Sequence, residues 1–146
     1  MKKIMMMLAL MLTLGTSFAF TGEKINKEAL NAFRYEYAGA TDIRWTIGKN
    51  YYKVAFTMNG KKLFAYYDNE GEFIAATQFI SSFQLPRHLQ KTLKKSLHNY
   101  WISDLFKMTT NEETFYYVTL ENADAKVVLK SADGSNWSIY QKTDKI

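Results

Sequence analysis

Residue types that catalyse reactions or bind metals are few in this chain and widely spaced. His88 and His98 are the only histidines, and there is no cysteine. On a helix, a separation of ten residues places the two imidazoles on different faces, and neither has a neighbouring histidine or cysteine to complete a metal site. We therefore expect no metal centre.

Acidic side chains gather mainly at turns. Glu70 and Glu72 flank one predicted turn, and Glu112 and Glu113 form another. A catalytic carboxylate pair must converge in space, and this spacing does not indicate that it does. The G-x-S-x-G, P-loop and H-E-x-x-H motifs are also missing from the sequence. We predict a non-enzymatic protein with no catalytic residue and no cofactor.

The chain is rich in aromatic residues, with ten Tyr, ten Phe and three Trp among 146 residues. Successive side chains of a strand point to opposite faces, so an adjacent tyrosine pair sends one ring to the core and one to the other face. Tyrosine on an open face suits protein recognition. The alternative is that cross-strand aromatic pairs only stabilise the sheet. The three pairs are Tyr51-Tyr52, Tyr66-Tyr67 and Tyr116-Tyr117.

A candidate binding face follows from these pairs and the lysines beside them. It comprises Tyr51, Lys53, Phe64, Tyr66 and Tyr116. Aromatic rings interleaved with lysines also suit single-stranded nucleic acid. The formal net charge is only +5, and Lys2 and Lys3 contribute two of those charges. This modest charge, together with predicted export, argues against a nucleic-acid partner.

The residues 50–73 contain the clearest structural signal. Apolar and polar residues alternate on both sides of Asn59-Gly60, which is typical of a β-hairpin with a type I′ turn. Asp68 to Gly71 supplies a second turn. A third strand therefore begins directly after this hairpin.

The remaining chain divides into two helices and further strands. Asn26 is a candidate N-cap for a helix that ends near Ala38-Gly39. Pro86 opens a second helix, with leucines at 89, 93 and 97 on one face and lysines at 91, 94 and 95 on the other. The other predicted strands are 41–47, 72–79, 101–110, 114–121, 125–131 and 136–141, and we expect the tail 142–146 to fray.

The two parts of the chain resemble each other. A shift of 64 residues aligns Phe33 with Leu97 and Val54 with Val118. Self-similarity of this size indicates duplicated supersecondary units. We predict an α+β fold made of a tandem repeat, about 26–80 and 85–141, each unit having one helix and a four-stranded antiparallel sheet.

The first residues read as an export signal. Met1-Lys2-Lys3 is basic, 4–18 is apolar, and Ser17-Phe18-Ala19 is a small-x-small cleavage site. The run is short for a membrane anchor, so we expect cleavage after Ala19, a mature domain of 20–146 and no membrane span. The absence of cysteine excludes disulfides and a lipid anchor at cysteine. The predicted location is periplasmic or secreted.

Several short motifs along the chain carry a family resemblance. They are Ile43-Arg44-Trp45, Tyr52 to Phe56, Tyr67-Asp68, Gly71, Leu85-Pro86, Phe115 to Leu120 and Gly134. Their order resembles the PepSY-like or beta-lactamase-inhibitor-like (BLIP-like) family of small exported bacterial proteins over about 27–140. The resemblance implies tandem units of one helix and a four-stranded sheet, and a concave sheet surface that grips a partner. Ala38 stands where the family has proline, and the disulfides of the inhibitor prototypes are absent.

Taken together, the sequence predicts an exported, non-enzymatic binding protein. Its partner would be another exported or envelope protein, and inhibition is one form that such recognition takes. The alternative is a periplasmic carrier of a small ligand, with a pocket between the sheet and the helices. A carrier requires a deep apolar cavity, whereas protein recognition requires a shallow open face.

Overall fold

The computed structural model describes residues 24–145. Within this range, eight strands form one antiparallel sheet in which the strand order follows the chain from β1 to β8. The elements are α2 (Lys27–Glu36), β1 (Thr41–Ile47), β2 (Tyr51–Met58), β3 (Lys61–Asp68), β4 (Phe73–Phe79), η1 (Ser82–Gln84), α3 (Arg87–Ser96), β5 (Trp101–Thr109), β6 (Thr114–Glu121), β7 (Ala125–Ser131) and β8 (Ser138–Asp144).

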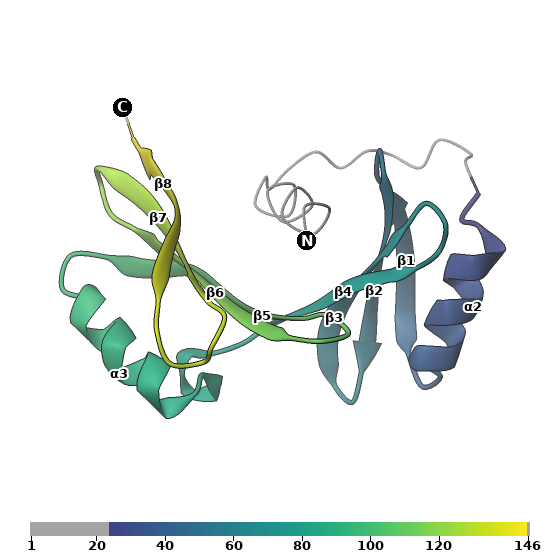
Figure 1. The fold of residues 1–146 in the computed structure, drawn as a ribbon, viewed down its shortest axis with the longest axis horizontal. Coiled ribbons are helices and arrows are strands. Elements are labelled where there is room, and N and C mark those ends of the chain that lie inside the picture. The colour runs from purple at the N-terminus through teal and green to yellow at the C-terminus, as the bar shows by residue number, and fades with distance from the viewer. Residues whose placement is uncertain (1–23, 146) are drawn as a thin grey trace.

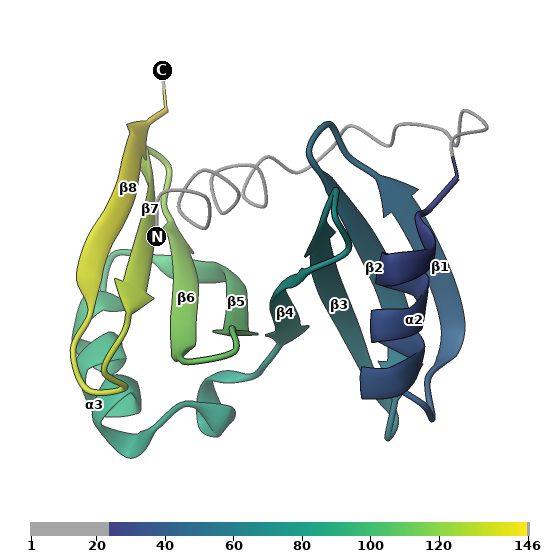
Figure 2. The ribbon, with the colours of Figure 1, turned by 45° about the vertical axis from the view of Figure 1, so that its right-hand side comes forward.

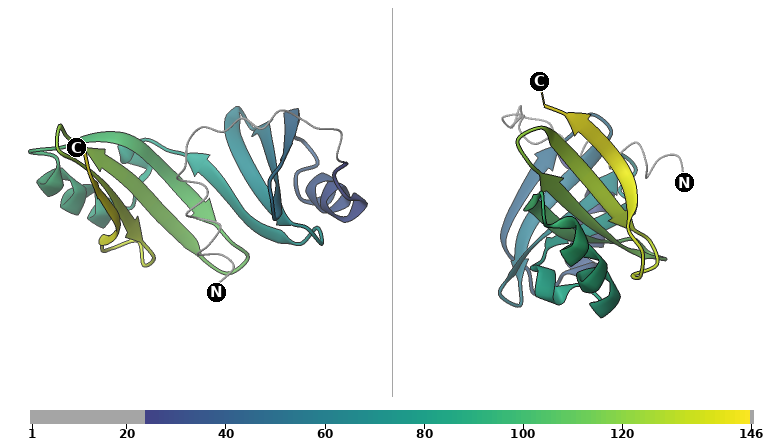
Figure 3. Two further views of the ribbon diagram at one scale, coloured as in Figure 1. Left: turned by 90° about the horizontal axis from the view of Figure 1, so that it is seen from above. Right: turned by 90° about the vertical axis from the view of Figure 1, so that its left-hand side faces the viewer.

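The sheet bends into an arch, and both helices lie on its outer, convex side (Figure 1; Figure 2 and Figure 3 show other views). One helix covers β1–β4 and the other covers β5–β8. Bulges interrupt the register of alternate strand pairs, namely β1/β2, β3/β4, β5/β6 and β7/β8. Because a bulge bends its strand and increases the local twist, these irregularities favour the curvature of the sheet.

The predicted hairpin is present between β2 and β3. Met58 pairs with Lys61, and both turn residues have positive φ, 52° at Asn59 and 73° at Gly60. This is the backbone conformation that a type I′ turn requires. The hairpin predicted from the alternation of apolar and polar residues is therefore confirmed, with its turn at Asn59-Gly60.

The start of α2 is fixed by a polar cap. The side chain of Asn26 accepts a hydrogen bond from the backbone N–H of Ala29 at 2.8 Å and donates one to the carbonyl of Asn69 at 2.7 Å. The second bond ties the helix to the β3–β4 turn. Gly71 lies against the same helix turn, since a Cβ added there would come within 2.6 Å of the Ala29 nitrogen. The predicted N-cap is confirmed, although the helix ends at Glu36, earlier than predicted.

Two apolar cores lie between the helices and the sheet. Each contains side chains from one helix and from the strands beneath it, and Trp137 adds a hydrogen bond from its indole Nε1 to the Leu89 carbonyl at 3.2 Å. Under α2 the buried members are Ala29, Phe33, Val54, Phe56, Ala65 and Tyr67. Under α3 they are Leu85, Leu89, Leu93, Leu105, Val118 and Leu120.

Two expectations need correction. The strands form one continuous sheet rather than a four-stranded sheet in each unit, because β4 pairs with β5 along four residue pairs, from Ala76↔Thr109 to Phe79↔Phe106. The last strand runs to Asp144 instead of fraying from Lys142. Descent of the two parts from one duplicated unit stays a prediction.

The export signal lies outside the described residues, and no helix within them is long and apolar enough to cross a bilayer.

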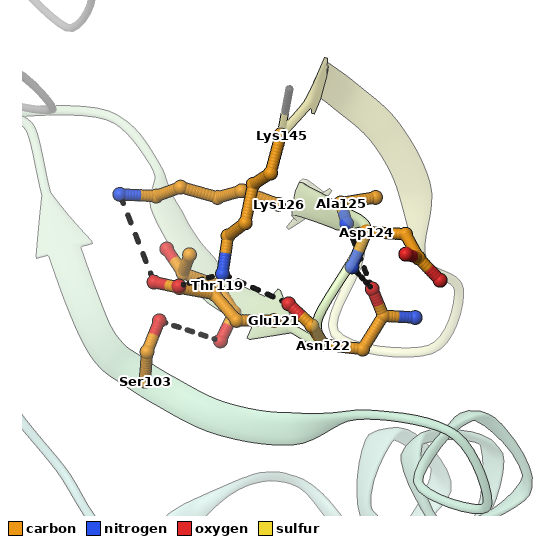
Figure 4. Close-up of polar contacts among 8 residues, drawn as sticks. All are labelled: Ser103, Thr119, Glu121, Asn122, Asp124, Ala125, Lys126 and Lys145. Carbon is orange, nitrogen blue, oxygen red and sulfur yellow. Dashed lines mark hydrogen bonds and ion pairs between the residues drawn. The ribbon is translucent and has the colours of Figure 1, made fainter.

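A polar cluster holds the end of β8 (Figure 4). The Lys145 ammonium donates to a carboxylate oxygen of Glu121 at 2.8 Å and to the Asn122 carbonyl at 2.9 Å. Lys126 lies 3.9 Å from the same carboxylate. The hydrogen bond from Lys145 is the main cause that lowers the pKa of Glu121. These contacts explain why the segment predicted to fray continues as a strand instead.

The two glycines of positive φ in the first half allow a matched stability test. A Cβ at Gly71 would overlap backbone atoms of α2, whereas a Cβ at Gly60 meets nothing within 4 Å. We expect Gly60→Ala to cost about 1 kcal/mol from backbone strain alone. Gly71→Ala should cost about 2–4 kcal/mol, because the overlap adds to the same strain. Urea unfolding of both variants measures the difference, and equal losses would contradict the close packing of this turn on α2.

Candidate functional site: the concave aromatic face

The sheet face that neither helix covers carries a row of aromatic rings. In the first half, Tyr51 and Tyr66 lie with ring centroids 6.1 Å apart. Phe64 and Phe79 meet edge to face at 6.0 Å. Phe79 is 55% exposed and stands at the middle of the sheet, on its fourth strand.

The row continues across the junction into the second half. Phe79 lies 6.5 Å from Phe106, which stacks on Tyr117 at 5.0 Å with only 16° between the ring planes. Tyr117 then meets Tyr140 edge to face at 5.7 Å. We call these seven rings the aromatic ladder: Tyr51, Tyr66, Phe64, Phe79, Phe106, Tyr117 and Tyr140. It extends from β2 to β8.

Lysines lie over the rings of the ladder. The Lys53 nitrogen is 4.6 Å from the Phe64 centroid and 5.8 Å from that of Tyr66, so it bridges the two rings. Lys62 approaches Phe64 at 5.7 Å. Burial, together with the positive charge of Lys62, lowers the pKa of Lys53. The face therefore presents cations held against aromatic surface, an arrangement of attractive cation–π contacts.

A similar contact occurs in the second half. The Lys130 nitrogen lies 4.3 Å from the Phe115 centroid and 5.7 Å from that of Tyr117. Register explains this placement, because Lys130 pairs with Tyr117 across β6 and β7. Both halves of the concave face thus combine a ring with a lysine from the neighbouring strand.

Two tyrosine hydroxyls of the ladder, those of Tyr66 and Tyr117, are poor acid–base groups. Burial raises the pKa of Tyr66 to about 12, although a hydrogen bond with Thr77 acts in the opposite direction. Burial also raises the pKa of Tyr117 well above its ordinary value. Both hydroxyls stay protonated at neutral pH, so they can form hydrogen bonds but supply no general base.

Four of the five residues predicted for the binding face lie on it. Tyr51, Lys53, Phe64 and Tyr66 occupy neighbouring positions of β2 and β3, where Lys53 pairs with Tyr66. Whether they bind a partner stays a prediction. Tyr116 is placed differently, since it packs with the core under α3.

The assignment of Tyr116 to this face is therefore wrong. Its strand position has the same parity as Val118 and Leu120, which lie in the core under α3. Tyr117 points the other way and joins the ladder. The alternation of β6 could have shown this, because Val118 is the counterpart of Val54 under the 64-residue shift.

The sequence reasoning also missed Phe79, Phe106 and Tyr140. The first two become neighbours only through the pairing of β4 with β5, which joins segments separated by a helix. Tyr140 reaches the ladder at a register shift between β7 and β8. No local pattern reports either feature.

The residues first considered for chemistry do not form a reactive site in the described part of the chain. His88 and His98 are both exposed, and residues 24–145 contain no group of three potential ligands able to hold a metal ion. Burial raises the pKa of Asp104. Glu121 is paired with Lys126 and Lys145, so it is part of an ionic cluster.

A separate groove of about 380 Å³ lies on the helix side of the sheet. It is bordered by the C-terminal end of α2, with Glu36 and Tyr37, and by β4 and β5, with Gln78, Lys107 and Thr109. The sheet is uncovered here because each helix covers only its own half. Its volume lies at the lower end of the range for small-molecule sites.

Comparison with known proteins identifies the fold. No protein-family model matches the sequence, and no curated protein matches it. Solved structures do match. A DUF2874 family protein from Bacteroides ovatus has a TM-score of 0.73 at 14% identity, covering 84% of this chain and 89% of that one. A BLIP-like protein from Bacteroides fragilis has a TM-score of 0.71 at 21% identity, covering 84% and 87%.

A candidate periplasmic protein from Bacteroides eggerthii gives a similar result, with a TM-score of 0.71 at 14% identity over 84% of this chain and 90% of that one. These structures have the fold of this chain. At such low identity, the likeness establishes the BLIP-like arrangement of sheet and helices and says nothing about individual binding residues. PepSY-like character, the other part of the predicted resemblance, is not shown.

The hydroxyls of two ladder tyrosines allow a second test. The Tyr117 hydroxyl is buried and has no hydrogen-bond partner among the described residues, whereas that of Tyr66 is bonded to Thr77. An unpaired buried hydroxyl is destabilising, so Tyr117→Phe should raise the free energy of unfolding by about 1 kcal/mol. Tyr66→Phe should lower it by about 1 kcal/mol. Chemical denaturation measures both, and a loss of stability in Tyr117→Phe would show that its hydroxyl is bonded after all.

Proposed function

We propose that this protein is an exported, non-enzymatic binding protein that recognises another exported or envelope protein through its concave sheet face. The observation that carries the proposal is the aromatic ladder, a row of rings on the face that the helices leave uncovered. Phe79 is its exposed ring, and Tyr51, Phe64 and Tyr140 are partly exposed. Tyrosine and phenylalanine supply rigid contact area with little loss of conformational entropy, and tyrosine adds a polar group. Lysines over the rings add positive charge next to this area.

The shape of the sheet supports the same proposal. A concave surface can surround a protruding loop of a partner and so bury more area than a flat one. The fold is shared with a protein described as BLIP-like, which supports protein recognition. Inhibition of the partner is one form that this recognition takes. Periplasmic or secreted location is part of the proposal, in keeping with the candidate periplasmic protein of the same fold.

The binding proposal can be tested with exposed rings on opposite sides of the sheet. Phe79 lies on the ladder and is 55% exposed, whereas Tyr35 lies on α2, outside the ladder, and is 90% exposed. We expect Phe79→Ala to reduce partner retention at least tenfold, since central aromatic contacts often contribute more than 1.4 kcal/mol to binding. Tyr35→Ala should bind like the unchanged protein.

The measurement is quantitative affinity capture from an envelope extract, with each variant immobilised at equal density. Phe79 is half exposed, so its truncation should leave the fold intact, and circular dichroism checks this. Equal capture by both variants, or loss only in Tyr35→Ala, would remove the concave face as the recognition surface.

The second candidate function is that of a small-ligand carrier, and the groove beside α2 favours it. The groove has about 380 Å³, mixed polar and apolar lining, and a lysine and a glutamate at its border. We expect Lys107→Trp to obstruct the groove. If the protein is a carrier, this variant should lose the thermal stabilisation that its ligand provides, while Phe79→Ala keeps it. A ligand screen by thermal shift, in which no compound stabilises the unchanged protein, would leave this function without support.

A further inference from the structure

The outer face of α3 carries a dense and unpaired positive charge. Four cations, Arg87, Lys91, Lys94 and Lys95, are exposed on this helix. They recur at intervals of three and four residues and so lie on one face, opposite the buried Leu89 and Leu93. Two exposed histidines, at 88 and 98, flank the group.

No acidic residue balances this face locally. The sequence has no Asp or Glu between Glu72 and Asp104. Among the described residues, the ion pairs join Lys126, Lys142 and Lys145 to carboxylates, and none involves a cation of α3.

The turn that approaches the start of α3 contains one acidic residue, Asp133, whose carboxylate accepts hydrogen bonds within the turn itself. Gly134 of that turn lies next to Pro86, since a Cβ added at Gly134 would stand 3.7 Å from the Pro86 Cγ. Asp133 in the same turn accepts hydrogen bonds from the backbone N–H groups of Ser135 and Asn136, both at 2.8 Å. These bonds lower its pKa and keep the carboxylate ionised, but no ion pair joins it to a cation of α3. Among the described residues, the cations of α3 therefore have no paired counter-charge.

The other helix provides an internal comparison. α2 occupies the equivalent place over the first half of the sheet (Figure 1). Its exposed charged residues are Lys27, Glu28, Arg34 and Glu36, two basic and two acidic. A basic outer face is therefore not a requirement of the fold, because α2 performs the same packing role without one.

An exposed ring lies beside the basic helix. Phe83, in η1, is 86% exposed. The Gln90 side chain donates a hydrogen bond to the Phe83 carbonyl at 3.2 Å, which holds η1 against the first turn of α3. Lysine and arginine next to an exposed aromatic ring are typical of surfaces that rest in the headgroup region of an anionic bilayer.

We propose that the outer face of α3, together with Phe83, docks on an anionic phospholipid bilayer. The cations would lie near the headgroups, and the ring would enter the interface. The aromatic ladder lies on the opposite face of the sheet, so a protein docked in this way keeps its concave face turned away from the lipid. This surface is independent of the proposed protein recognition, and either one can fail without the other.

The test is co-sedimentation with lipid vesicles. The chain should begin at residue 20, because the apolar segment 4–18 would bind lipid by itself. All helices and strands described above lie within residues 24–145. We expect binding to phosphatidylcholine vesicles that contain about one third phosphatidylglycerol, and none to pure phosphatidylcholine. Binding should fall steeply between about 0.1 M and about 1 M salt, as the Debye length shortens.

Charge variants identify the helix responsible. Each basic residue near an anionic membrane contributes about fivefold in partitioning, so the triple variant Lys91→Gln/Lys94→Gln/Lys95→Gln should bind about 100-fold more weakly. The matched control, Lys27→Gln/Arg34→Gln on α2, should bind within about twofold of the unchanged protein. Absence of binding to the anionic vesicles, or equal loss in both variants, would overturn the proposal.

A variant at Phe83 distinguishes a bilayer from a soluble polyanion as the partner of α3. Phe83→Ser should weaken binding to anionic vesicles several-fold, because the ring no longer enters the interface. It should leave binding to a single-stranded oligonucleotide unchanged. Binding of the oligonucleotide through the α3 lysines, without binding to the vesicles, would overturn the proposal in favour of a soluble polyanion.

Discussion

The pairing of β4 with β5 is the contact on which the rest of this structure depends. It comprises four residue pairs between strands that are separated in the chain by η1 and α3. Without it the molecule would consist of two small sheets, each with one helix and two exposed edges, and such edges favour association with other chains. With it, the chain has one sheet and only β1 and β8 as edges. The same pairing places Phe79 beside Phe106 and so completes the aromatic ladder.

Both helices cover the same face of the sheet, and this leaves the other face available for contact with a partner. Two apolar cores lie on the convex side, under α2 and α3. The concave side has a third cluster of buried residues, including Phe106, Met108 and Tyr117, and must stabilise it without a covering helix. It does so with stacked rings and lysines laid over them, a surface that is stable in water and still able to contact a partner. Buried ladder residues such as Tyr66 and Tyr117 support the exposed ones. Stabilisation of the sheet and recognition are therefore compatible roles for the same rings.

The two halves of the molecule are similar in fold, but their charged residues are distributed differently. The helices have equivalent packing roles, but α2 has a balanced outer face and α3 a basic one. The concave face holds its lysines against aromatic rings, whereas the lysines of α3 extend into solvent. These are two different surfaces on opposite faces of the sheet, and they suit partners of different chemistry.

The sequence by itself determined the local elements, because each depends on neighbours in the chain. The Asn59-Gly60 turn, the Asn26 cap and the leucine stripe of α3 all follow from backbone preference and periodicity. Strand alternation likewise determined that Tyr51, Lys53, Phe64 and Tyr66 share a face. Only the tertiary structure decided that the two halves form one sheet, that Phe79 and Phe106 meet, and that the last strand extends to Asp144. These features depend on pairing between segments far apart in sequence and on an ion pair from Lys145 to Glu121, and no local pattern encodes such contacts.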